Sequence, residues 1–189
     1  MVLAGSASLG QIVEIWSVAT EHVMLNNRGG IELDEAPPVD MLSAFFEARG
    51  WQIEERSEEE ISLHIKGSWT SYMLRAIWRR EDQVLQLLLL PELRVPEDRR
   101  AAVYEVLALI NEQLWLGHFD IWSDNSMVVF RHAMILGAGM LSVEQAQSIV
   151  DSAIDEWERF YPVFQFILWS DKTPREAIDH AMIDTQGEA

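Results

Sequence analysis

The spacing of apolar residues changes along the chain between the period of a helix and that of a strand. The first helical pattern follows Asp40, a residue typical of a helix N-cap, and stops before Gly50, which suits the left-handed position after a helix. Its apolar face consists of Met41, Leu42, Phe45 and Phe46. The pattern predicts a helix of about ten residues.

Four strand patterns follow this helix, separated by short polar connections. They cover residues 51–55, 61–66, 69–78 and 84–90. Because strands joined by such tight connections run antiparallel to one another, this part of the chain predicts an antiparallel meander.

The second half of the chain repeats the change of period. Pro96 and its two acidic neighbours suit the first turn of a helix, and apolar residues at helical spacing continue from there toward Gly117. Two strand patterns, 119–123 and 127–134, flank a polar turn in which Asn125 is expected to take the left-handed conformation. This segment predicts a helix followed by a second hairpin.

Two further helices are predicted near the C-terminus. A capping box at Ser142 starts the longer one, which is expected to run for about five turns until Pro162 kinks or ends it. Thr173 and Pro174 start the shorter one. Because helices and strands are segregated rather than alternating one by one, the order predicts an α+β fold, a twisted antiparallel sheet with helices packed against it.

The composition of the two ends of the chain suggests the domain organisation. Residues 1–38 hold a small-residue start, a glycine pair and two prolines, and are predicted to be a tail that is partly disordered or weakly helical. Residues 39–183 form the predicted domain, and residues 184–189 a frayed C-terminus.

An apolar stripe at helical spacing is the one structural signal of the tail. It consists of Ile12, Ile15, Trp16, Ala19 and Val23. Two interpretations are open: the stripe packs on its own domain or forms a weak helix, or it docks on a partner.

Composition narrows the function classes. A hydrophobic share of 49% with 8 Trp and 7 Phe excludes a disordered chain. The formal net charge of -17 disfavours binding to nucleic acid or anionic membrane, and no apolar run approaches the length of a membrane span. With zero cysteines the chain has no disulfide, thiol nucleophile or thiolate metal site, and we expect a cytoplasmic protein without a cofactor.

Residues that could carry chemistry are few, and the chain has no phosphate-binding loop, nucleophile elbow or zinc-binding helix motif. One enzyme hypothesis rests on His118, Asp120 and His132, which fall on strands expected to pair and which could form a carboxylate-histidine cluster. A second alternative is a small-ligand sensor with an aromatic pocket. Its lining would be Trp69, Trp78, Trp115, Trp122 and Trp157, residues that more often fill a core.

The two faces of the predicted sheet are both partly apolar, whereas a sheet with one buried face shows cleaner polar alternation. One face carries Met73, Arg75, Ile77, Arg79, Leu88, Val129 and Arg131. We expect another subunit, the tail or a client protein to cover it, with the arginines suiting an acidic or backbone-carbonyl partner. In the alternative, the domain's own helices cover both faces.

A family resemblance lies in the segment from Val95 to Asp120. Its first part reads Val95-Pro96-Glu97-Asp98-Arg99-Arg100, and its second runs from Val103-Tyr104-Glu105-Val106-Leu107 through Asn111-Glu112-Gln113-Leu114-Trp115 to Asp120. The segment resembles the bacterial YbjN family, whose label of sensory-transduction regulator names no defined reaction. The likeness continues to His132, and the predicted element order between about residues 40 and 170 also fits.

The resemblance implies a fold similar to type III secretion chaperones, often assembled as a homodimer. It supplies no catalytic residues. Together with the acidic composition, it favours a non-enzymatic protein-binding module with a chaperone-like or regulatory role, which holds a polypeptide segment on an exposed sheet face or edge.

Overall fold

The computed structural model describes residues 37–137, 140–170 and 172–184, and it confirms the α+β fold. The helices are α2 (Pro38–Ala48), α3 (Arg100–Asn111), α4 (Val143–Trp169) and α5 (Pro174–Asp184), with a 3-10 turn η2 (Glu97–Arg99) before α3. The strands are β1 (Ile53–Arg56), β2 (Glu60–Lys66), β3 (Ser71–Arg79), β4 (Val84–Pro91), β5 (His118–Trp122) and β6 (Met127–Ile135).

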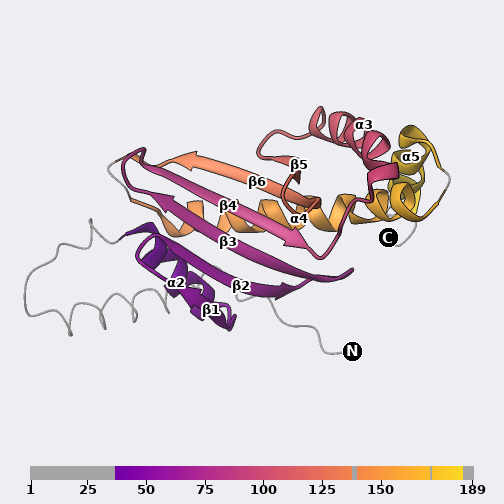
Figure 1. Cartoon of the computed structure of the whole chain (residues 1–189). Coiled ribbons are helices and arrows are strands. Elements are labelled where there is room, and N and C mark those ends of the chain that lie inside the picture. Colours follow the sequence, from indigo (N-terminus) through magenta and orange to yellow (C-terminus); the bar gives the residue numbers. More distant parts are fainter. Residues whose placement is uncertain (1–36, 138–139, 171, 185–189) are drawn as a thin grey trace, which may run out of the picture.

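These strands form a six-stranded antiparallel sheet in the order β1-β2-β3-β4-β6-β5 (Figure 1). The first four strands make the meander that the short connections predict, and β5 with β6 makes the second hairpin. β6 rather than β5 pairs with β4, so β1 and β5 are the two edges of the sheet.

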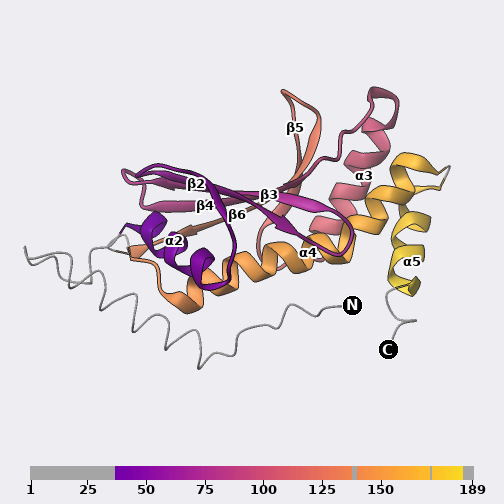
Figure 2. The ribbon, with the colours of Figure 1, turned by 90° about the horizontal axis from the view of Figure 1, so that it is seen from below.

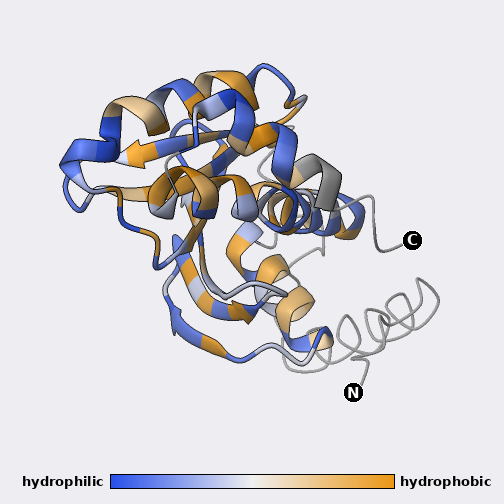
Figure 3. Cartoon of the chain, turned by 90° about the vertical axis from the view of Figure 1, so that its right-hand side faces the viewer, coloured by the Kyte–Doolittle hydropathy of each residue, from blue (hydrophilic) through white to orange (hydrophobic). Residues whose placement is uncertain are grey.

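The main core lies between one face of the sheet and the helices, with α2 and α4 beneath that face (Figure 2). Apolar and polar segments follow one another along the strands, as the bands of colour in Figure 3 show. On β3, for example, Tyr72, Leu74 and Ala76 are fully buried in the core, while the residues between them point to the other face.

Helix α4 continues through Pro162 to Trp169, so of the two predicted outcomes, a kink or an end of the helix at this proline, the end is wrong. Proline has no N–H, and in a regular helix that group would bond the carbonyl of Glu158, four residues earlier. The indole Nε1–H of Trp69 donates to this carbonyl instead, at 3.0 Å, and its ring stacks on Tyr161. A side chain from the β2–β3 turn therefore replaces the hydrogen bond that the proline removes.

Replacing Trp69 with phenylalanine is expected to lower the free energy of unfolding by about 0.5 to 1.5 kcal/mol, because an aromatic ring stays on Tyr161 while the Glu158 carbonyl loses its donor. Urea denaturation followed by circular dichroism measures this loss. Trp169→Phe is the control, since the Trp169 side chain is exposed and makes no hydrogen bond to the described residues. Equal stability of the two variants would refute the role of Trp69.

Two predicted details differ in the structure. α2 begins at Pro38, two residues before the expected cap, and Asp40 instead binds Arg56 at 2.7 Å. The left-handed residue of the β5–β6 turn is Ser126, with φ 56°, because Asn125 uses its side chain to accept from the Met127 N–H. The capping box at Ser142 is confirmed.

Candidate functional site

The sheet face turned away from α2 and α4, here called the open face, carries all seven residues of the predicted binding face. In the register of the sheet, Leu88 lies directly between Arg75 on β3 and Arg131 on β6. The apolar residues of the open face form a small second cluster, and every member of this cluster lies on a strand. The cluster contains Ile77, Leu88, Leu90, Trp122, Met127 and Val129.

The members of this face differ in what they offer a partner. Leu88 and Val129 are buried, although no helix of the described chain belongs to their cluster. Met73 has 38% of its surface exposed. The long side chains of Arg75 and Arg131 flank Leu88 and can cover it. Met73 and the polar groups near it are thus the accessible part.

The arginines of the open face have acidic neighbours. Arg75 binds Glu60 with atoms 2.6 Å apart, and Arg79 binds Asp82 at 2.8 Å. Arg131 lies 3.6 Å from Asp120 on the neighbouring strand. These cations stabilise contacts within the sheet, and a partner would gain little from them unless it displaced an internal carboxylate.

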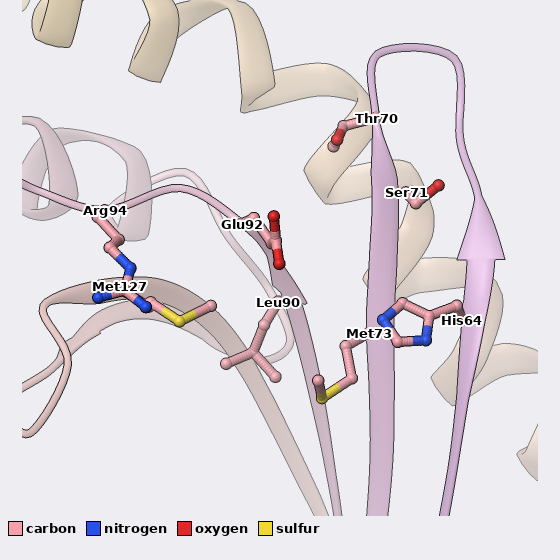
Figure 4. A pocket seen from close by; sticks show the side chains of 8 residues that line it. All are labelled: His64, Thr70, Ser71, Met73, Leu90, Glu92, Arg94 and Met127. Atoms are coloured by element: carbon pink, nitrogen blue, oxygen red, sulfur yellow. The ribbon is translucent and has the colours of Figure 1, made fainter. Parts of the chain in front are cut away.

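A groove of about 570 Å³ lies on the open face, where β2 turns into β3 and β4 ends. It is lined by His64, Thr70, Ser71, Met73, Leu90, Glu92, Arg94 and Met127. In Figure 4 the apolar side chains of Met73, Leu90 and Met127 lie between Arg94 on one side and His64 on the other. The groove therefore combines an apolar floor with a polar rim, the usual composition of a binding pocket.

One wall of the groove is the segment after β4, and it is fixed to β6. Arg94 forms an isolated β-bridge with Met127, the Val95 N–H donates to Ser126, and the Val128 N–H donates to Leu93. Within the described residues no ion pair joins the Arg94 side chain, which is exposed. This wall is therefore ordered by backbone bonds while its guanidinium stays available to a ligand.

The opposite wall is the β2–β3 turn, and Glu158 of α4 fixes it. The Ser68 N–H donates to the Glu158 carboxylate at 3.0 Å, next to the Trp69 bond described above. The buried Tyr72 hydroxyl lies beside the same carboxylate, and burial together with this charge raises the pKa of Tyr72 far above its usual range. Both walls are tied to the core, so the groove is largely pre-formed.

The edges of the sheet offer less. The side-chain amide of Asn111 in α3 binds both backbone groups of Phe119 on edge strand β5, accepting from N–H at 2.8 Å and donating to C=O at 3.0 Å. The Ile121 N–H is taken by the Asp120 carboxylate. At the other edge, β1 is only four residues long, irregular and mostly charged. Such edges resist the addition of a further strand.

The predicted histidine-carboxylate cluster does not form. His118 and Asp120 lie on the open face, whereas His132 is buried on the helix side, where its Nδ1 is 3.5 Å from the Ser152 hydroxyl. Burial lowers the pKa of His132, so this ring favours the neutral form. No group of three or more metal-binding side chains occurs among the described residues.

The five tryptophans of the predicted aromatic pocket are dispersed, and none lines the groove. Trp78 and Trp157 belong to the main core, and Trp122 packs on the small cluster of the open face. Trp69 caps the Glu158 carbonyl, and Trp115 is 97% exposed. The predicted aromatic pocket therefore does not form among the described residues, and the groove of the open face has methionine and leucine at its base instead.

Comparison with known proteins adds to this geometry. Residues 38–166 match the model of the YbjN family, described as "putative bacterial sensory transduction regulator". The chain belongs to the YbjN family. The YbjN segment runs from the first residue of α2 into α4, and it contains all groove residues. The description names a regulator and not an enzyme family.

A solved YbjN structure shares the fold. Its title reads "Crystal structure of YbjN, a putative transcription regulator from E. coli". The two chains align with a TM-score of 0.50 and 16% sequence identity, over 77% of this chain and 94% of that one. At this identity the match shows the fold alone. No protein with a curated description matches the chain in sequence.

Other predictions lie outside this description. The tail stripe from Ile12 to Val23 and residues 185–189 fall outside the described residues, and the stripe also precedes the segment that matches YbjN. No helix of the described chain is long and apolar enough to cross a membrane.

Proposed function

We propose that this YbjN-family protein is a non-enzymatic regulator that works by binding a polypeptide segment of another protein in the groove of the open face. The observation that supports this most is the combination of a pre-formed groove with two sheet edges that resist strand addition. Strand addition, the alternative mode, needs free backbone groups at an edge. We take the setting to be cytoplasmic, in keeping with a sequence without cysteine, and the action to be chaperone-like, as the family resemblance implies.

The groove indicates the chemistry of the segment that it would bind. Methionine and leucine form an adaptable apolar floor that suits side chains such as leucine, methionine or phenylalanine. Arg94 on the rim suits a carboxylate or a backbone carbonyl of the partner. A partner segment with one or two apolar anchors next to an acidic residue would fit both the apolar floor of the groove and Arg94.

Nucleic acid is not the partner in this proposal. The net charge of -17 repels a phosphate backbone, and three of the arginines on the open face, Arg75, Arg79 and Arg131, already have carboxylates beside them. The E. coli relative is titled as a transcription regulator. If this chain also affects transcription, we propose that it does so through a protein.

Site-specific photo-crosslinking in the native cells tests the proposal. A photoreactive amino acid at Ser71, on the groove rim, is expected to give one reproducible crosslinked protein whose contact peptide carries apolar residues beside an acidic one. Met73→Glu places a charge on the apolar floor and should reduce the yield at least about tenfold. Met140→Glu is the matched control, because Met140 is 43% exposed against 38% for Met73 and does not line the groove.

Loss of the product in both variants, or in neither, would contradict the proposed site. We also propose that the chain forms a homodimer, and light scattering on the purified chain tests this proposal. If Met73→Glu converts a dimer to a monomer while Met140→Glu does not, the groove is the subunit contact and the binding of another protein there is refuted.

A further inference from the structure

We infer that the N-terminal tail of the same chain seats its apolar stripe, Ile12 to Val23, in the groove and is displaced when a partner binds. The inference rests on the proposed function, because it assigns a regulatory occupant to the same site. It assigns a binding site to the apolar stripe in the sequence of the tail, and it explains how Met73 and Met127 can remain accessible on the folded domain.

The tail is long enough to reach the groove. Asp40 binds Arg56 at the end of β1, so α2 starts near the β1–β2 turn, whereas the groove lies at the other end of β2. The seven residues of β2 span about 23 Å at the usual rise of a strand, and passing round the β1 edge to the open face adds about 10 Å for two strands at their usual spacing. Fourteen residue steps separate Val23 from Pro37, and they reach up to about 46 to 50 Å.

The stripe also has the chemistry that the groove accepts. Ile12, Ile15 and Trp16 recur at spacings of three and four, the pattern of an amphipathic helix that places anchors in an apolar groove. The tail is acidic, with five Asp or Glu against one Arg in residues 1–36. The rim of the groove carries one acidic residue, Glu92, and one cation, Arg94, which no ion pair of the described residues engages. A carboxylate of the tail therefore complements Arg94, at the end of the groove formed by Arg94 and Met127.

A tethered occupant sets a threshold for the partner. Because the tail and the groove belong to one chain, the effective concentration of the stripe at the groove reaches about millimolar for a short flexible connection. A partner that binds the groove must outcompete this local concentration, so weak apolar segments are rejected. Weakening the stripe should then raise the apparent affinity for the partner.

Disulfide trapping in the full-length chain tests the inference directly, because the chain has no cysteine of its own. The double variant Ser17→Cys/Ser71→Cys places one thiol beside Trp16 and one on the groove rim. The control Ser17→Cys/Ser57→Cys uses an exposed position in the β1–β2 turn, nearer to the start of α2. A tail that does not bind the groove would contact the control position at least as often as Ser71→Cys, because fewer residues connect Ser17 to Ser57 than to Ser71.

A seated tail is expected to form the intramolecular disulfide at least about fivefold faster with Ser71→Cys than with Ser57→Cys, and Met73→Glu but not Met140→Glu should remove the difference. Equal or slower formation at Ser71→Cys would overturn the inference. Disulfide-linked dimers as the main product would also overturn it, because they would show the tail of a second copy in the groove.

The partner experiment separates this inference from the proposed function. Trp16→Glu in the tail should increase the photo-crosslink from Ser71 to the partner if the tail competes for the groove. A partner product that Trp16→Glu leaves unchanged refutes the tail inference and leaves the proposed function standing. Selective trapping of the tail without any partner product refutes the proposed function instead.

Discussion

Trp157→Ala is expected to lower the free energy of unfolding by about 3 to 5 kcal/mol, the largest single loss that we predict for this chain. Trp157 is fully buried on α4, and its ring packs 4.9 Å from Phe119 and 5.4 Å from Phe164 between centroids. Its Nε1–H also donates to the Leu89 carbonyl at 2.8 Å, in the strand beneath. Alanine would leave both a cavity and a buried carbonyl without this donor.

Urea denaturation followed by circular dichroism measures this loss. The matched control is Trp115→Ala, which removes the same side chain from a position that is 97% exposed and should cost within about 0.5 kcal/mol. Similar losses for the two variants would show that α4 does not hold the sheet through Trp157.

Gly117→Ala is expected to cost about 2 to 4 kcal/mol, through backbone strain and a steric clash together. Gly117 has φ +69°, a conformation that L residues rarely adopt. A Cβ atom there would lie 2.9 Å from the Arg131 carbonyl oxygen and even closer to the Phe130 ring. Neither neighbour moves easily, because both belong to β6, and Phe130 is fully buried.

Gly50→Ala separates the two causes, since Gly50 has φ +71° but nothing within 4 Å of the added atom. It should pay only the cost of the left-handed backbone, about 1 to 2 kcal/mol. Melting temperatures and urea midpoints of the two variants give the comparison. If Gly50→Ala is as unstable as Gly117→Ala, the close approach to β6 has no energetic role.

The elements that the sequence predicts correctly are those whose signals are local. Alternation along β2 and β3 and the capping box at Ser142 depend on neighbours a few residues away, and the structure contains all of them. The continuation of α4 through Pro162 could not be predicted, because the group that compensates for the proline is Trp69, 89 residues from Glu158 in sequence.

The candidate site shows the same limit. Alternation places Met73, Leu88 and Val129 on one face, but it does not reveal that Leu88 and Val129 are covered by their neighbours. The polar rim escaped sequence analysis because Glu92 and Arg94 follow a strand in an irregular segment, whose position comes from pairing with Met127. In contrast, strand alternation alone already separates the two histidines. His132 is two residues from the buried Phe130 and shares its face, whereas His118 is adjacent to the buried Phe119 and points to the other face.

The amide of Asn111 has a further effect on the behaviour of the protein in a crowded solution. Bare strand edges let identical molecules line up into growing ribbons and fibres. Here the backbone of edge strand β5 already bonds to a side chain of its own molecule, and the opposite edge strand, β1, is short and charged. Assemblies of this chain are therefore expected to stay finite, and the protein can accumulate without polymerising through its backbone.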